Sequence, residues 1–379
     1  PKSHVRLTPT VLLLLLAALL ATACGRDREP AVAEAAAEPA AAEQQSQPDA
    51  PAPTGVRADG TFRIVATTTQ ASDLSRILTD GVPNIDITPL MGAGVDPHLY
   101  QPTESDIRAM NAADMVIYSG LHLEGQFDAV FAALREQGTM IYSLSKPVKD
   151  AGFVIGGFGA DETQSGTDDP HFWFDPRNWE ITVADLAQTL AELDPGNAAT
   201  YTARAEAYNA QLRTLFTWAD EGMRSVPEGQ RYLVTSHDAF QYFGAAFGWR
   251  MAGIQGISTE DETGVGDIQR TAQFVVEQNI PVLFVESSIS PDTIEAVQAA
   301  IEAEGGSVRV GVRELYSDAM GMPGTFAGAY IGMIAENVYT ILQSYRCAGA
   351  PAAIPDWPDS IDLRPPEELL AANCETEEP

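Results

Sequence analysis

Three histidines and one aspartate occupy comparable places in the sequence, each beside a predicted strand or in a stiff, polar loop. They are His98 in VDPHLYQP, His171 in DDPHFWFDP, His237 in LVTSHDAF and Asp318 in LYSDAMG. In open α/β sheets, ligands bind at the carboxyl ends of the strands, so side chains from four such segments can converge in one cleft. A single histidine is more often an ordinary surface or core residue, but three of them together with an aspartate predict a shared site.

The chemistry of these side chains favours a divalent metal ion. Imidazole nitrogens suit zinc and other transition metals, and a carboxylate supplies charge and tolerates harder ions such as manganese. Four protein ligands close a tetrahedral site and leave no position for water, which favours holding a metal over activating a nucleophile. We expect the metal affinity to fall as the pH drops toward the ordinary histidine pKa of about 6.5.

A secreted zinc-dependent hydrolase or lyase is the alternative reading of the same residues. It would bind zinc through the three histidines, keep Asp318 off the metal and use Glu286, in FVESS, as the nearby acid or base. The sequence contains no HExxH or similarly compact motif.

The elements that must position these side chains alternate along the chain. From residue 61, short β-rich runs alternate with amphipathic helical stretches, which is typical of parallel strands joined by helices. The expected fold class is α/β with two lobes, residues 61–193 and 226–345, each a parallel-type sheet with flanking helices. Residues 194–225 predict one long helix, about 45 Å if continuous, that bridges the lobes. Its apolar stripe is most simply a packing face: Tyr201, Ala205, Tyr208, Leu212, Leu215, Ala219 and Met223.

The first 60 residues predict export and tethering. Residues 1–23 combine two basic residues with a short apolar run, as in a secretory signal peptide, and the run is too short for a comfortable membrane span. The segment ATAC resembles a bacterial lipobox, which would make Cys24 a lipid anchor; an ordinary signal peptide is the alternative. Residues 24–60 are rich in Ala, Pro, Glu and Gln and predict a disordered tether.

Cysteine content and charge narrow the possibilities further. Two thiols left over in an exported protein usually pair, so we expect a disulfide between Cys347 and Cys374 that pins the tail, residues 346–379. The formal net charge of −31 makes nucleic acid an improbable partner. Most of these carboxylates are expected to form a solvated surface.

Several long motifs together resemble the metal-binding receptors of ABC transporters, the periplasmic or lipoprotein solute-binding proteins for zinc and manganese known as cluster A-I. The similar stretches run in order from about Arg63 to Tyr345: GVDPHLYQPTESDIRAMNAADMVIYSGLHLEG, DPHFWFDP, LVTSHDAFQYFGAAFG, LFVESSISPDTIEAV and LYSDAMG. The resemblance implies two α/β lobes bridged by one rigid helix, with the metal gripped between them. It also implies a protein that is not an enzyme, acts outside the cytoplasm at the cell membrane or in the periplasm, is expected to be a monomer, and delivers its metal to an ABC permease and its ATPase.

The resemblance also suggests a role for each residue. His98, His171, His237 and Asp318 match the first to fourth ligands; the third is Glu in some manganese receptors. By ligand softness the set favours zinc, with manganese next. Glu286 is expected to orient a ligand histidine, and His122 in GLHLEG to have a structural or supporting role near the site.

Two further features bear on the subgroup and on the alternatives. Residues 146–169, where zinc receptors often carry a histidine-rich acidic loop, contain acids but no histidine. The sequence therefore either departs from that subgroup or belongs to a manganese-type or general zinc receptor. An adhesion lipoprotein that keeps the fold and binds metal only structurally is a third possible reading.

Overall fold

The computed structural model describes residues 60–156, 168–260, 262–371 and 374, all within one compact unit of the chain, Asp49–Pro379. The expected signal peptide, nearly all of the expected tether, and Cys24 lie outside the described residues. Across the ranges that are described, no helix is both long and apolar enough to span a lipid bilayer.

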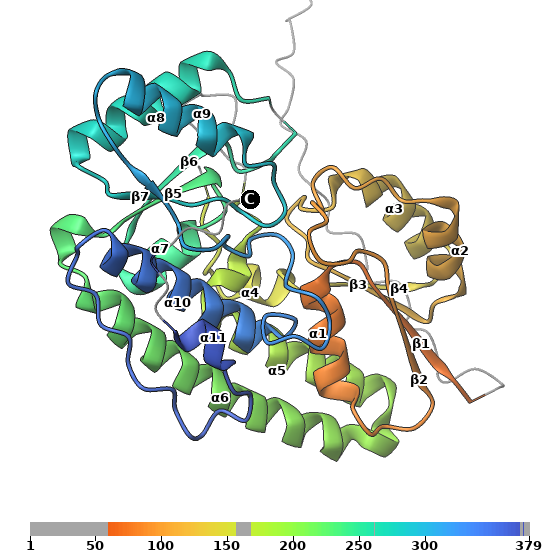
Figure 1. Ribbon diagram of the computed structural model, residues 1–379. Helices are drawn as coiled ribbons and strands as arrows, with labels where there is room; N and C mark the ends of the chain where they lie inside the picture. The colour runs from red at the N-terminus through yellow and green to blue at the C-terminus, as the bar shows by residue number, and fades with distance from the viewer. Residues whose placement is uncertain (1–59, 157–167, 261, 372–373, 375–379) are drawn as a thin grey trace, which may run out of the picture. The chain divides into compact units, whose positions relative to one another are not determined.

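A four-stranded parallel sheet organises the N-terminal lobe (Figure 1). Its strand order is β2-β1-β3-β4. Alternate residues of a strand point to opposite sides of the sheet, and helices pack on both sides. Ile64 of β1 packs into the large core that contains α1 and α5 residues, whereas Val65 packs with residues of α2 and α3. The elements are β1 Phe62–Ala66, α1 Thr69–Thr79, β2 Ile85–Pro89, α2 Glu104–Ala112, β3 Met115–Tyr118, α3 Asp128–Glu136, β4 Met140–Ser143, α4 Lys146–Asp150 and α5 Pro176–Leu193.

The C-terminal lobe is built on shorter parallel strands. The pairs β5–β6 and β7–β8 are both parallel, and a parallel bridge between Thr235 and Phe284 places the two pairs side by side. The elements are β5 Tyr232–His237, α7 Gln241–Phe247, β6 Arg250–Gln255, α8 Val265–Gln278, β7 Val282–Leu283, α9 Asp292–Ala303, β8 Arg309–Val310 and α10 Tyr330–Cys347. The expected α/β class with two parallel-type sheets is confirmed.

One 28-residue helix, α6 Ala198–Ser225, packs against both lobes. It contacts α1 and α5 on the N-terminal side and α7 and α10 on the C-terminal side, and Figure 1 shows it running beneath them. All seven residues of the predicted apolar stripe are buried, which confirms that the stripe is a packing face. The exact lobe boundaries, 193/194 and 225/226, stay a prediction.

The C-terminal tail folds back over α6 and α10. A disulfide joins Cys347, the last residue of α10, to Cys374, and the Arg309 guanidinium donates to the Cys374 carbonyl at 2.8 Å. Between the two cysteines, the Trp218 indole of α6 donates to the Pro355 carbonyl at 3.1 Å. A short helix, α11 Glu367–Leu370, also lies in this tail.

Replacing both cysteines by serine is expected to destabilise the protein. Closing a loop of 27 residues removes about 3.5 kcal/mol of denatured-state entropy in the chain-entropy model. We expect the Tm of the double serine variant to fall by roughly 5–10 °C in a calorimetric scan without reductant. The parent should approach the variant when reductant is added, and equal melting temperatures of parent and variant without reductant would contradict the expectation.

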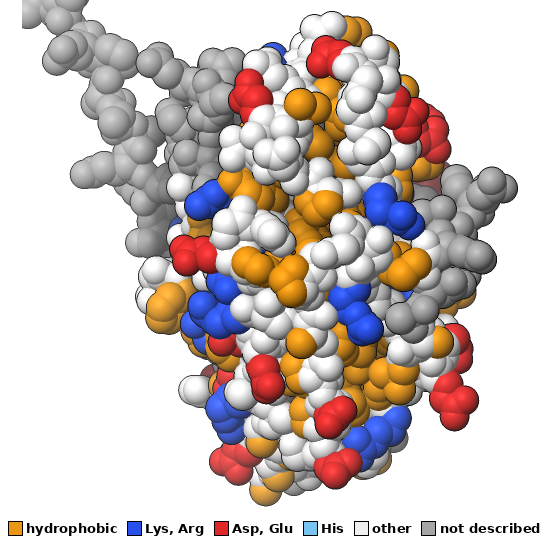
Figure 2. Space-filling view, turned by 60° about the vertical axis from the view of Figure 1, so that its left-hand side comes forward, with side chains coloured by type: hydrophobic (Ala, Val, Ile, Leu, Met, Phe, Trp, Pro, Cys, Tyr) orange, Lys and Arg blue, Asp and Glu red, His pale blue; other side chains and the backbone are white. Residues whose placement is uncertain are grey.

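Charged side chains of both signs are scattered over the face of the molecule that Figure 2 shows. On this face, acidic and basic groups are interspersed among hydrophobic and uncharged ones (Figure 2). This arrangement fits the expectation that many of the carboxylates behind the net charge of −31 are solvated.

Candidate metal centre

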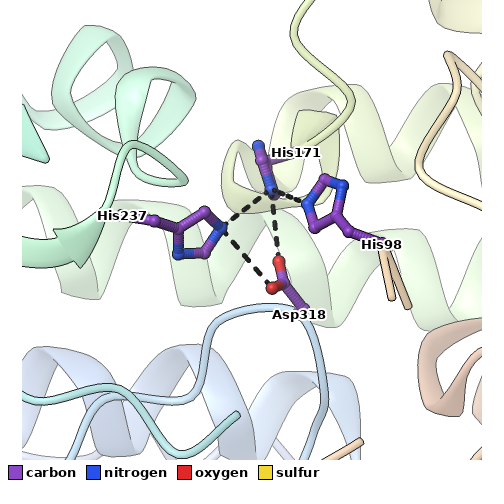
Figure 3. A group of neighbouring side chains, drawn as sticks. All are labelled: His98, His171, His237 and Asp318. Carbon is purple, nitrogen blue, oxygen red and sulfur yellow. Dashed lines mark hydrogen bonds and ion pairs between the residues drawn. The ribbon is translucent and has the colours of Figure 1, made fainter. Parts of the chain in front are cut away.

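The structure brings the four sequence-predicted ligands together, although neighbouring pairs along the chain are 66 to 81 residues apart. His98 lies in the loop between β2 and α2, and His171 directly precedes the 3-10 turn Phe172–Phe174 before α5. His237 is the last residue of β5, and Asp318 lies in the loop that leads to α10. Figure 3 shows the four side chains pointing toward one another, and all are at most 2% exposed.

Four of the distances between the donor atoms match the edges of a tetrahedron around one small ion. The Nε2 atom of His171 lies 3.4 Å from Nε2 of His98 and 3.3 Å from Nε2 of His237. The Asp318 oxygens lie 3.2 Å from Nε2 of His171 and 3.4 Å from Nε2 of His237. Zinc–ligand distances of about 2.0–2.1 Å give tetrahedron edges of roughly 3.3–3.4 Å. All four donor atoms lie within 4.8 Å of one another, so one ion can contact all of them.

Two carboxylates orient two of the histidine rings so that the Nε2 lone pair of each ring points toward the centre of the cluster. Nδ1 of His171 lies 2.8 Å from Oδ1 of Asp169, and Nδ1 of His237 lies 2.6 Å from Oε2 of Glu286. A neutral imidazole that donates its Nδ1 proton to a carboxylate keeps an unprotonated Nε2, which is the form that binds a metal. The two rings therefore present acceptors to the centre of the cluster.

Asp318 adds a buried charge whose nearby counter-groups are the rings of His171 and His237. Within the described part of the chain, neither carboxylate oxygen accepts a well-aligned hydrogen bond, although both are buried. A buried, ionised carboxylate without hydrogen bonds costs several kcal/mol unless a counter-charge is present. A divalent cation at the centre would supply that charge, so the donor set fits a metal.

The pKa values of the cluster follow from the same contacts. Burial by itself would lower the pKa of His171, but Asp169 and Asp318 outweigh it and raise that pKa to about 9. Burial also opposes protonation of His237, yet Glu286 and Asp318 raise the pKa of His237 well above its usual range. Burial lowers the pKa of His98 to about 3. Burial would raise the pKa of Asp318, but His237 and His171 hold it well below its ordinary value. Without metal, protons take the place of the cation.

Two Asp-Pro-His turns place His98 and His171. Oδ1 of Asp96 accepts from the backbone N–H of His98 at 2.9 Å, and Oδ1 of Asp169 accepts from that of His171 at the same distance. An aspartate that bonds the backbone two residues ahead forms an Asx turn, and the proline between them restricts the turn further. These local bonds determine where each ring leaves the backbone.

The residues expected to support the ligands divide into one that reaches the site and one that does not. Glu286 accepts from the backbone N–H of His237 at 2.8 Å in addition to its contact with the ring. The side chain of His122, in contrast, is 80% exposed and lies 3.3 Å from Asp128, so it does not join the cluster. Leu121 and His122 both adopt positive φ, 54° and 64°, which turns this segment outward after β3.

The role of Asp169 was not predicted from the sequence. The pattern that could have indicated it is the repeated Asp-Pro-His, which places an aspartate two residues before each of two predicted ligands. Asp175 and Asp238 act locally, as caps or turn residues: Asp175 caps α5 by accepting from the Arg177 N–H, and Asp238 accepts from the Gln241 side chain.

Replacing Glu286 by glutamine is expected to weaken zinc binding by about 10- to 100-fold. If the amide nitrogen faces Nδ1 of His237, the ring must accept there and carry its proton on Nε2, the atom that faces the cluster. A competition titration with a zinc chelator measures the effect. Asp128→Asn, which alters the contact to exposed His122, is the control and should leave the affinity unchanged. An unchanged affinity in Glu286→Gln would show that the carboxylate does not set the tautomer.

Comparison with known proteins places the chain among metal-uptake components. A family model described as zinc-uptake complex component A, periplasmic, matches residues 64–344, which excludes the tail. The zinc-binding protein TroA of Treponema pallidum is 37% identical over 287 residues, covering 76% of this chain and 90% of that protein. The manganese-binding lipoprotein MntA of Bacillus subtilis is 36% identical over 292 residues, covering 77% of this chain and 92% of that protein.

Solved structures agree with this placement. The periplasmic zinc-binding protein TroA from Treponema pallidum superposes with a TM-score of 0.70 at 36% identity, covering 78% of this chain and all of that one. The Fe(III)-bound YtgA from Chlamydia trachomatis has a TM-score of 0.66 at 22% identity and covers the same share of this chain, which supports the fold alone.

Proposed function

This chain belongs to the family of periplasmic zinc-uptake components, and we propose on that basis that it captures a divalent transition metal ion outside the cytoplasm and delivers it to an ABC permease. Zinc is the favoured cargo and manganese the next. Such a protein makes and breaks no covalent bond, in keeping with a family of solute-binding transport proteins.

The observation that carries the proposal is the closed set of four buried donors. Four of their mutual distances, 3.2–3.4 Å, suit the edges of a zinc tetrahedron, and all donors lie within 4.8 Å of one another. The carboxylates of Asp169 and Glu286 direct two imidazole lone pairs toward the centre. A site that supplies its ligands from the protein and buries them all holds an ion and has no position for a reacting water.

The same geometry explains why zinc is favoured and why manganese is the next choice. Nitrogen-rich sites bind zinc more tightly than manganese in the usual order of divalent metals. Both oxygens of Asp318 nevertheless face ring nitrogens of the cluster, so a larger ion could engage both oxygens and gain a fifth ligand. TroA carries zinc in its name and MntA manganese, so relatives of similar identity bind either metal.

The hydrolase reading is not favoured. Glu286, the residue it would use as acid or base, has one oxygen on the His237 backbone and the other on the His237 ring. Both oxygens are therefore occupied with a ligand candidate and turned away from any substrate. An adhesion role with a structural metal has no observation in the described residues to carry it.

The location and partners follow from the same proposal. Relatives are named as periplasmic proteins or as lipoproteins, so we place this chain outside the cytoplasm. We propose that Cys24 carries a lipid that anchors it to a membrane, that residues 24–60 tether the folded unit, and that a monomer meets the permease and its ATPase.

Metal content tests the proposal. The chain is purified without added metal and analysed by elemental mass spectrometry, and zinc and manganese are then titrated in competition. We expect one tightly held zinc per chain and weaker manganese. Preferred manganese would keep the site and change the cargo, and no stoichiometric metal of either kind would refute the proposed function.

A further inference from the structure

Residues around two of the four donors, His171 and Asp318, are held by hydrogen bonds that cross between the lobes. The Gln70 amide of α1, in the N-terminal lobe, donates to the Asp318 carbonyl at 3.0 Å. The Tyr242 hydroxyl of α7, in the C-terminal lobe, donates to the Asp169 carbonyl at 2.9 Å. The Trp173 indole, two residues after His171, donates to the Ser317 carbonyl at 3.3 Å. These bonds tie the Asp318 loop and the His171 turn to the core beneath the site.

His98 reaches the site from a different kind of segment. Its loop, between β2 and α2, contains no helix or strand over residues 90–103. Oδ2 of Asp96 accepts from the Thr259 hydroxyl of the C-terminal lobe at 2.6 Å, while Oδ1 holds the His98 backbone. One carboxylate thus joins the His98 turn to the opposite lobe.

In both Asp-Pro-His turns the aspartate accepts from the backbone N–H of the histidine, but its other side-chain hydrogen bond differs. In Asp169, Oδ1 serves both the His171 backbone and the His171 ring, at 2.9 and 2.8 Å. In Asp96, the second bond leaves the turn and reaches Thr259. The aspartate of the His98 turn therefore bonds across the lobes.

Thr259 is well anchored to the sheet that carries His237. Its carbonyl accepts from the Gln255 amide at 3.1 Å, and Gln255 is the last residue of β6. In the parallel register of β5 and β6, Gln255 lies opposite His237. Thr259 itself is buried. The bond to Asp96 therefore fixes the His98 turn relative to the strand end that presents the third donor.

We propose that Asp96 and Thr259 form an inter-lobe latch that holds His98 against the other three donors and sets the rate at which metal is released. The two latch residues are positioning residues, because they act on the metal through His98. The latch rests on the proposed function for its role in release, but its effect on the loop can be measured without metal.

A valine at position 259 removes the hydroxyl and keeps the shape of the side chain. A hydrogen bond to an ionised carboxylate is among the stronger ones in proteins, so we expect Thr259→Val to release zinc roughly 10-fold faster. The association rate should stay the same, because the four donors themselves are unchanged. Thr259→Ser restores the hydroxyl and should return the release rate to within about threefold of the parent.

The chain offers a matched control in a second bond between the lobes. The Gln126 amide donates to Glu260 at 2.9 Å, one residue from Thr259, but this contact is exposed to solvent. It does not touch the His98 turn, and exposed polar contacts contribute little. Gln126→Ala should therefore leave zinc release unchanged.

The experiment uses the full chain and two measurements. Zinc-loaded protein is mixed with excess chelator in a stopped-flow instrument to obtain the release rate, and hydrogen exchange of residues 92–100 is followed in metal-free protein. We expect faster release and faster exchange in Thr259→Val only. Unchanged exchange and release in that variant, or an equal effect in Gln126→Ala, would overturn the latch. If the parent binds no zinc at all, the proposed function fails, and the exchange measurement still decides whether the latch holds the loop.

Discussion

An alanine at position 318 is expected to weaken zinc binding by about 100- to 1000-fold. Structural zinc sites with four ligands have apparent binding free energies of about 10–16 kcal/mol, and a quarter of this, about 2.5–4 kcal/mol, corresponds to roughly that loss. Asp318 supplies the negative charge in a set whose other members are imidazoles, so the effect should lie toward the upper end. The loss of charge matters most because the carboxylate is fully buried.

Competition with a chelator of known zinc affinity measures this loss. Asp318→Asn is the isosteric variant: it keeps one oxygen donor but removes the charge, and its affinity should fall between those of the parent and Asp318→Ala. Asp238→Asn is the control, because Asp238 follows His237 in sequence but accepts from Gln241. Its effect should be severalfold at most. Zinc binding by Asp318→Ala within tenfold of the parent would mean that Asp318 is not a ligand.

Zinc affinity is expected to rise by roughly 10- to 100-fold per pH unit between about pH 6.5 and 9. The pKa of His171 is raised to about 9 and that of His237 well above its usual range, so both rings carry protons at neutral pH when metal is absent. Each proton that the metal must displace makes the affinity tenfold more favourable per pH unit. His98, with its pKa lowered to about 3, is neutral throughout. The steep region therefore lies above the pH of about 6.5 expected from an ordinary imidazole.

Calorimetric titration in buffers of different ionisation enthalpy counts the displaced protons. At pH 7.5 we expect between one and two protons released per zinc ion. Asp169→Asn should release fewer, because the Asp169 carboxylate beside the ring contributes most to raising the pKa of His171 against burial. Zinc binding at pH 7.5 without proton release would show that the imidazoles are already neutral.

The same raised pKa gives the metal-free protein a pH dependence of opposite sign. The folded pKa of His171 lies above its unfolded value of about 6.5, so its contribution to stability is complete below pH 6.5 and is lost as the pH rises through about 9. The melting temperature of metal-free protein should fall over this range while metal affinity rises. Zinc-loaded protein should not show the fall, because the metal replaces the proton.

Much of the site could be predicted from the sequence because several of its residues lie in short, recognisable sequence patterns. The Asp-Pro-His spacing is an Asx turn in both places, and such a turn depends only on residues two apart. The alternation of strands and helices and the stripe of α6 are also local patterns, and both appear in the structure. The capping box of α2, in which Thr103 and Asp106 bond each other's backbone, belongs to the same class.

Other parts of the site depend on contacts between residues far apart in the sequence. Asp318 lies within the segment predicted to form the C-terminal lobe. Its backbone carbonyl nevertheless accepts a hydrogen bond from Gln70 of α1, in the N-terminal lobe. Glu124 is buried four residues after Gly120 and accepts from the backbone N–H groups of Ser119 and Gly120, which tightens this turn. A Cβ at Gly120 would lie 2.2 Å from the Ser143 hydroxyl oxygen, so the backbone at Gly120 passes close to β4. Two residues later, the side chain of His122 lies exposed to solvent.

The sequence by itself determined which side chains could bind a metal, which segments are helices and strands, and which turns present the first two histidines, because these depend on interactions between near neighbours. Only the tertiary structure decided that four donors, each 66 to 81 residues from the next along the chain, meet within 4.8 Å. It also decided that Asp169 directs the His171 ring, that His237 is the histidine that Glu286 orients, and that Asp96 bonds Thr259 across the lobes. Those outcomes depend on how the two sheets and α6 pack, and packing sums many weak contacts over the whole chain.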